Sequence, residues 1–136
     1  MQLNEMLDAH LKWVESGGKE GERANLQKAL LQEADLHDVN LQQADLEGAH
    51  LSVADLMRAN FTGANLKRAD LWMADLKDTI LQGAELQGAN LADVTNLTKA
   101  QIDSAIIDDS TVLPKELRGQ AGGDRGDKGT GHLTFT

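Results

Sequence analysis

Large apolar residues recur at every fifth position through the middle of the chain. Residues 24–93 divide into fourteen units of five, and the third residue of every unit is large and apolar. Ala opens twelve of these units, and Asp or Asn takes the second position in ten. The third positions are Leu26, Leu31, Leu36, Leu41, Leu46, Leu51, Leu56, Phe61, Leu66, Leu71, Leu76, Leu81, Leu86 and Leu91. An internal repeat of this length determines the fold.

A period of five suits neither an α-helix nor a straight strand. Five residues turn a helical side chain by about 500°, so the leucines would spiral around the helix surface. On a strand, an odd step sends successive leucines to opposite faces. All the leucines share a core only if the backbone turns once per unit, so that four units close a square coil. Stacked coils then pair their backbone groups at about 4.8 Å, and we expect Asp and Asn at the corners.

The run from Ala24 to Asp93, which includes ADLMRANFTGANLKRADLWMADLKD at residues 54–78, resembles the pentapeptide repeat family, whose consensus is A-(D/N)-L-x-x. The resemblance covers about half of the chain. It implies an all-β solenoid, a right-handed quadrilateral β-helix of about 3.5 coils. Because many family members come from cyanobacteria, it also implies a cyanobacterial origin.

A solenoid must cover its two apolar ends, and the chain offers a segment for each. Residues 1–23 are predicted to be an N-terminal capping helix and linker, 24–93 the β-helix, 94–114 a C-terminal cap and 115–136 a Gly-rich tail. The helix is expected over about residues 2–16, ending at Gly17 or Gly18. The tail has the composition of a flexible segment, although its last five residues alternate like a short strand. The apolar face of the helix consists of Leu3, Met6, Leu7, Leu11 and Val14.

The repeat loses its register after residue 93. One interpretation is a bulged continuation of the coil, and the other is a short helix with Thr98 as its N-cap and Gln101 completing a capping box. We favour the helix, in which Ile102, Ala105 and Ile106 share one face, because an inserted residue would break the column of leucines. Val112 and Leu113 are expected to complete this cap before Pro114.

The formal net charge of −9 argues against a nucleic-acid binder, because affinity for phosphates rests on Lys and Arg. The chain lacks cysteine and begins with no long apolar run, so we expect a cytoplasmic protein that does not enter a membrane. The acidic residues of the first helix disfavour membrane binding as well.

The four histidines show no metal-ligand spacing, and no nucleotide or nucleophile motif is present, so we expect no cofactor, metal or enzymatic activity. These histidines are His10, His37, His50 and His132.

Two outward columns follow from stacking residues twenty apart. Trp72 and Met73 occupy the two variable, outward positions of one unit, and Val53 lies one coil before Met73. Exposed apolar side chains placed together in this way predict a protein-contact patch. The alternative is that a terminal segment covers them. The second column holds the stacked carboxylates of residues 35, 55 and 75, which we expect to accept backbone N–H groups.

The favoured function is therefore a non-enzymatic scaffold or protein-binding module that presents rigid faces to an unidentified protein partner, as a monomer or an end-to-end dimer. The alternative is an acidic mimic of DNA acting on an enzyme such as gyrase, which the resemblance suggests for some family members. The predicted solenoid would equal only about five base pairs, at about 4.8 Å per coil and 3.4 Å per base pair, so this alternative ranks second.

Overall fold

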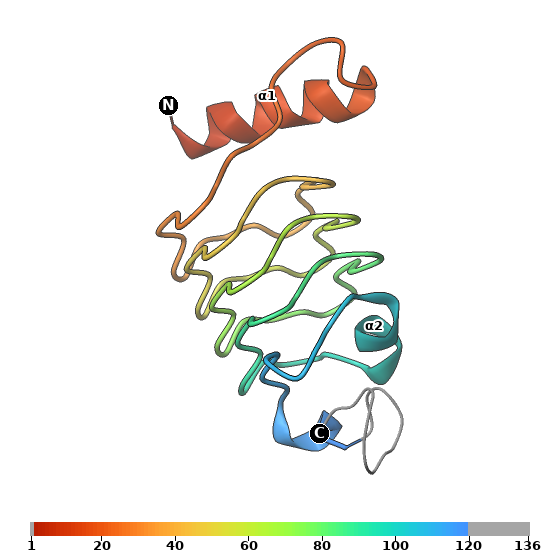
Figure 1. Ribbon diagram of the computed structural model, residues 1–136. Helices are drawn as coiled ribbons and strands as arrows, with labels where there is room; N and C mark the ends of the chain where they lie inside the picture. The colour runs from red at the N-terminus through yellow and green to blue at the C-terminus, as the bar shows by residue number, and fades with distance from the viewer. Residues whose placement is uncertain (1, 120–136) are drawn as a thin grey trace.

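The computed structural model describes residues 2–119, which form a helix, a stack of coils and a short C-terminal segment (Figure 1). The helix α1 spans Leu3–Glu15 and lies across the first coil. A second helix, α2, spans Lys99–Ser104 beside the last coils, and a 3₁₀ turn, η1, spans Lys115–Leu117. The predictions for residues 120–136 lie outside the described residues.

Parallel bridges join each coil to the next, and through residue 95 each bridge links residues twenty apart. They run along four sides of the stack, at the second position of each unit. Side 1 contains Asn25, Asp45, Asn65, Glu85 and Ile106; side 2 contains Leu30, His50, Asp70, Asn90 and Val112; side 3 contains Asp35, Asp55, Asp75 and Thr95; side 4 contains Asn40, Asn60 and Ile80. Four units therefore make one coil, as the period predicts.

The corners fall at the two variable residues of each unit. The N–H that opens the next unit donates to the preceding Leu carbonyl, as Ala54 does to Leu51 over 3.1 Å. The second variable residue has a φ between 56° and 74° in every unit, the left-handed region.

The prediction that Asp and Asn occupy the corners is wrong, because these residues lie on the straight sides. Their carboxylate or amide oxygen accepts the N–H two residues later, as Asp55 does from Met57 over 3.1 Å, and so leads the chain into the corner.

The core contains the leucine columns and the small residues that open each unit. Leu66 in the middle of the stack is 1% exposed, and Phe61 is fully buried. Thr79 replaces Ala at one first position, and its buried hydroxyl donates to the Leu56 carbonyl over 2.7 Å. This hydrogen bond satisfies the polar atom that Thr79 brings into the interior.

The helix α1 packs on the open end of the first coil through Leu3, Met6 and Leu7. Leu11 does not belong to the contact face as predicted, because its side chain is 38% exposed. The fully buried residue of α1 is instead His10, whose ring reaches down to backbone groups of the coils. The rotation of α1 that seats this imidazole turns Leu11 outward.

A glycine-rich link returns the chain from α1 to the first coil. Gly17 and Gly18 follow the helix with φ values of 66° and 88°. At Gly21 a Cβ atom would lie 2.2 Å from the carbonyl oxygen of Ala9, so only glycine lets the link pass this close to α1.

The helix α2 lies where the unit after Ile80 would continue side 4. It begins after the N-cap residue Thr98, as predicted. Thr98 and Gln101 form the reciprocal capping box, and Ile102 is buried. The side-chain amide of Gln101 also donates to the carbonyls of Leu76 (2.8 Å) and Thr79 (2.9 Å), which anchors α2 on the coil beneath it.

The chain rejoins the ladder after α2 rather than ending there. Ile106 pairs with Glu85 and Val112 with Asn90, so the offset grows from twenty residues to twenty-one and then twenty-two. The prediction that Ile106 shares a packed face with Ile102 is wrong, because Ile106 lies on side 1 and is 46% exposed. The two interpretations of this segment are each partly right, since helix and ladder both occur. The ladder thus continues beyond residue 93, the last residue of the predicted repeat region.

Candidate protein-contact patch

Trp72, Met73 and Val53 lie together at the corner between sides 2 and 3. Trp72 and Met73 are the two corner residues of one unit, and Val53 is the second corner residue one coil earlier. Their exposed fractions are 42%, 46% and 44%. The register therefore turns all three side chains outward, and we call these three residues the corner patch.

Backbone hydrogen bonds fix the spacing of the corner patch. The N–H of Val53 donates to the carbonyl of Trp72 over 2.8 Å, and the N–H of Met73 donates to the carbonyl of Ala92 over 3.2 Å. The Trp72 indole Nε1–H donates to the Asp93 carboxylate over 3.1 Å, which fixes the edge of the ring. The patch is thus held on a rigid backbone and needs no ordering of a loop before it meets a partner.

Val53 has a φ of 60°, a strained conformation for a residue branched at Cβ. Four other units place glycine at this corner position, at Gly48, Gly63, Gly83 and Gly88, where a positive φ carries no such strain. An apolar β-branched side chain at the surface in this conformation lowers stability without filling the core.

Carboxylates surround the corner patch. Glu33 and Asp93 occupy the same corner position in the first and last of its four coils, and side 2 adds Asp70. Side 3 adds Asp55 and Asp75. Within residues 24–93, neither side 2, side 3 nor the corner between them carries Lys or Arg. The patch therefore lies in a locally negative field.

The column of Asp35, Asp55 and Asp75 on side 3 accepts backbone N–H groups as expected. The donors are the residues two positions later, at 3.4, 3.1 and 3.1 Å. The outermost member has a further partner that the sequence analysis missed, because the His37 imidazole hydrogen-bonds to Asp35. This bond raises the pKa of His37 and lowers that of Asp35.

The side chains of Asp35, His37 and Asp55 place metal-binding atoms within 4.8 Å of one another. Spacing among the histidines alone gives no sign of this cluster, since its members come from two coils. The available signal was Asp-x-His within one unit and Asp twenty residues after the first Asp.

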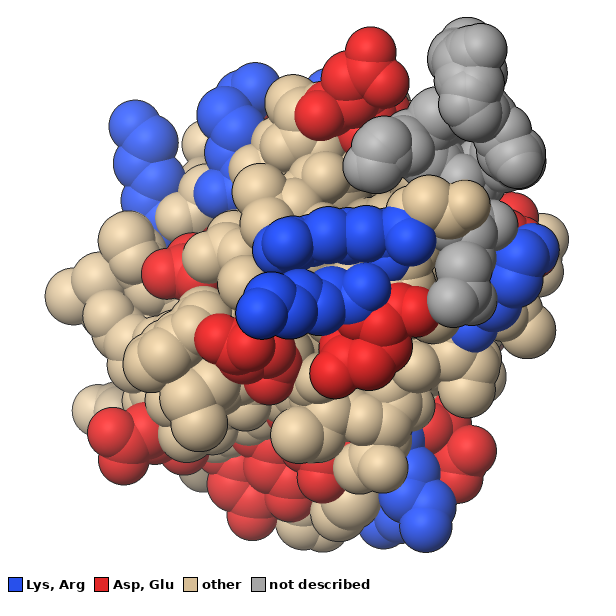
Figure 2. Space-filling model, turned by 90° about the horizontal axis from the view of Figure 1, so that it is seen from below, with Lys and Arg blue, Asp and Glu red and all other residues tan. Residues whose placement is uncertain are grey.

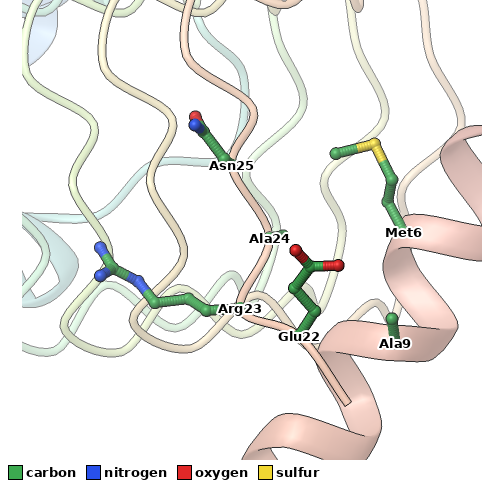
Figure 3. Close-up of a pocket in the computed structure, with 6 residues that line it drawn as sticks. All are labelled: Met6, Ala9, Glu22, Arg23, Ala24 and Asn25. Atoms are coloured by element: carbon green, nitrogen blue, oxygen red, sulfur yellow. The ribbon is translucent and has the colours of Figure 1, made fainter. Parts of the chain in front are cut away.

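A hollow of about 170 Å³ lies between α1 and the first coil (Figure 3). Met6 and Ala9 line it from the helix, and Glu22 and Ala24 from the link and first unit, while the side chains of Arg23 and Asn25 point away from the helix. The Arg23 Nε–H already donates to the Gln43 carbonyl over 2.8 Å. The hollow therefore has few polar groups with which to orient a ligand.

The repeated units match the sequence profile of a known family. The profile of pentapeptide repeats matches in overlapping segments at residues 22–52, 34–72, 54–93 and 74–109, which together cover well over half of the chain. The chain belongs to the pentapeptide repeat family. Members of this family and their structural neighbours fold as right-handed quadrilateral β-helices.

Two solved pentapeptide repeat proteins resemble this one along most of its length. The first comes from the cyanobacterium Nostoc PCC 7120, with 31% identity, a TM-score of 0.59, and coverage of 79% of this chain and 84% of that one. The second is a protein of the Arabidopsis thaliana thylakoid lumen, with 26% identity, a TM-score of 0.54, and coverage of 70% and 68%. The family and the fold are therefore both shown, at moderate sequence identity.

The search of curated proteins gives no match to this pentapeptide repeat protein. Within residues 2–119, no helix combines the length and the hydropathy needed to cross a membrane.

Proposed function

We propose that this pentapeptide repeat protein is a non-enzymatic scaffold that binds a protein partner through the corner patch of Val53, Trp72 and Met73. In this proposal α1 and the segment of residues 94–114 cover the ends of the coil stack, and the rigid sides between them present the patch.

The observation that carries the proposal is the exposed apolar corner itself. Trp and Met are among the residues enriched in protein interfaces, and a buried Trp is a frequent anchor. The β-branched side chain of Val53 supports the same conclusion, because it adds strain at a position where every unit has a positive φ, and such strain at the surface suggests a role other than stability. The backbone ladder holds the patch in place, so binding would cost little conformational entropy.

The surrounding carboxylates indicate the chemistry of the partner. A segment with an apolar side chain flanked by Lys or Arg would cover the patch and complement Asp70, Asp75 and Asp93. A Lys or Arg over the Trp72 ring would add a cation–π contact. We therefore propose a basic, amphipathic protein segment as the partner.

A capture experiment from cells of the source organism tests the proposal. The wild-type chain is compared with a Trp72→Ala, Met73→Ala double variant and with Gln82→Ala, a control at the first corner position of another corner. We expect a captured protein that the double variant loses and the control retains. The purified pair should then show a Kd at least about fivefold weaker for Trp72→Ala, equal to about 1 kcal/mol. Equal binding by all three chains would refute the role of the patch.

The charge arrangement favours the DNA-mimic alternative only on sides 2 and 3, and the rest of the coil surface argues against it. Basic side chains interrupt the acidic surface at two other corners, where Arg58 pairs with Asp38 and Arg68 with Glu47. Figure 2 shows the same mixture of Lys, Arg, Asp and Glu at the C-terminal end of the molecule. A duplex mimic needs rows of unpaired negative charge, so the scaffold remains our proposal.

A further inference from the structure

The carboxylates of Asp35 and Asp55 lie one coil apart on side 3 and converge on the imidazole of His37. We propose that these three side chains form a surface site for one divalent transition-metal ion, with Zn²⁺ as the best match. The site shares no residue with the corner patch, and it does not depend on the proposed function.

The donor atoms are close to the spacing that zinc requires. Zinc binds nitrogen and oxygen at about 2.0–2.2 Å, so two donors of a tetrahedral ion lie about 3.4 Å apart. His37 Nδ1 is hydrogen-bonded to Asp35 and lies 3.9 Å from Asp55 Oδ2. Small rotations about the side-chain bonds would therefore place all three donors around one ion.

Asp55 can bind an ion and keep its structural hydrogen bond. Its Oδ1 accepts the Met57 N–H over 3.1 Å, while its other oxygen, Oδ2, faces the imidazole. In Asp35 a single oxygen, Oδ1, both accepts the His37 N–H at 3.4 Å and contacts the imidazole Nδ1. An ion would replace the proton between Nδ1 and this oxygen, whose second lone pair would keep the backbone N–H.

A neighbouring ion pair is placed to orient the imidazole. Asp38 lies 3.8 Å from His37 Nε2, and the Arg58 guanidinium holds Asp38 through two bonds of 2.7 and 3.0 Å. With Nδ1 on the metal, Nε2 would carry the ring proton and point it at Asp38. A carboxylate that accepts this second ring proton is a usual companion of a metal-binding histidine.

The backbone beneath the cluster is fixed before any ion arrives. The N–H of Leu36 donates to the Asp55 carbonyl, and the Asp55 N–H donates to the Ala34 carbonyl, both over 2.9 Å. These bonds hold the two coils in register at the position of the ligands. The site would therefore bind without refolding, and an ion would add a cross-link between the coils.

The donor set indicates the class of metal. One imidazole nitrogen with two carboxylates suits Zn²⁺ and its neighbours Ni²⁺ and Cu²⁺, whereas Ca²⁺ and Mg²⁺ prefer sets made of oxygen alone. Three protein ligands leave the fourth zinc position to water or to a group from another molecule.

Calorimetric titration of the full chain with ZnCl₂ at neutral pH tests the site. We expect one ion per chain. The Kd for Zn²⁺ should weaken at least about tenfold in His37→Ala and in Asp55→Asn, and about tenfold in Asp38→Asn.

Asp75→Asn is the matched control, because it removes the next carboxylate of the same column and leaves the three ligands intact. A His50→Ala, His132→Ala double variant should retain binding, and Ca²⁺ should not compete. All the changed ligands lie at the surface or half-buried, and circular dichroism checks that each variant is folded.

Each contrary outcome overturns the proposal. A wild-type chain that takes up no Zn²⁺ at millimolar concentration has no such site. Binding that persists in His37→Ala, or disappears in the His50→Ala, His132→Ala variant, places the ion elsewhere on the chain. Equal competition by Ca²⁺ would mean that the acidic surface attracts cations without a specific ligand set.

Discussion

His10 accepts the backbone N–H of Ala24 at Nδ1 over 2.9 Å, with its ring fully buried between α1 and the first coils. Its Nε2 must therefore carry the ring proton, which it donates to the Gln42 carbonyl over 2.8 Å. The ring also stacks on Trp13, with centroids 5.5 Å apart. One neutral imidazole thus ties α1 to two separate units of the repeat.

Acidification should weaken this attachment. Burial lowers the pKa of His10, the Gln42 hydrogen bond acts in the opposite direction, and nearby Arg23 lowers the pKa further. The unfolded chain therefore binds more protons than the folded one between the lowered folded pKa and the unfolded value of about 6.5. The His10 contribution is fully present above that value and is lost as the pH falls through the folded pKa.

Urea unfolding at several pH values checks this prediction. The free energy of unfolding of wild type should fall below about pH 6.5, and His10→Gln should remove that part of the slope. At neutral pH His10→Gln should cost about 1–3 kcal/mol, because it disturbs two buried hydrogen bonds. His50→Gln, which removes an exposed histidine instead, is the control. An unchanged slope in His10→Gln would show that His10 does not govern the acid response.

The inward and outward positions of one unit should differ sharply in their sensitivity. Leu66→Ala should lower the free energy of unfolding by about 2–5 kcal/mol, because it leaves a cavity in the middle of the stack. Lys67→Ala, one residue later, should change it by less than about 0.5 kcal/mol. Denaturant unfolding measures both variants, and equal losses would contradict the inward orientation of Leu66.

Relief of strain at Val53 should stabilise the protein. Val53→Gly replaces a β-branched residue at a φ of 60° and should raise the free energy of unfolding by about 1 kcal/mol. Ile80→Gly, on side 4 and not at a corner, should be destabilising, because glycine there gains no conformational relief. Thermal melts of the two variants should therefore move in opposite directions. A lower melting temperature for Val53→Gly would mean that its side chain contributes packing that outweighs the strain.

Gln101 should be needed as an amide and not merely as a capping residue. Gln101→Glu keeps an oxygen for the Thr98 N–H but loses the donor to the Leu76 and Thr79 carbonyls, so it should cost about 1–3 kcal/mol. Thr98→Ala, which removes the N-cap alone, should cost about 1 kcal/mol. Chemical denaturation compares the two, and a neutral Gln101→Glu would show that the two carbonyl contacts contribute little.

The period of five was sufficient to predict a backbone that turns once per unit with Leu inside. Only that arrangement places residues such as Leu66 and Leu86 in one buried column. The position of the corner could not be predicted from residue type alone, because Asp and Asn suit both a corner and the position just before it. The Asp55 oxygen bonded to the Met57 N–H shows which of the two applies.

Features that depend on contacts between distant segments were missed for a physical reason. The burial of His10 depends on which way α1 rotates over the first coil, and the apolar pattern of α1 left Leu11 equally eligible. The return of Ile106 to the ladder depends on how many residues α2 takes up. The cluster of Asp35, His37 and Asp55 needs both the register between coils and the rotamer of a histidine at a variable position.

The corner patch as a contact surface is the central claim, and site-specific photo-crosslinking tests it most directly. A benzophenone amino acid at Ser52 would sit at the same corner while leaving Val53, Trp72 and Met73 intact, and one at Gln82 serves as the control on another corner. In cells of the source organism we expect a discrete protein adduct from position 52 that is absent at position 82 and disappears when Trp72→Ala is added. The absence of an adduct at position 52 would contradict the claim. So would the same adduct at positions 52 and 82 that remains when Trp72→Ala is added.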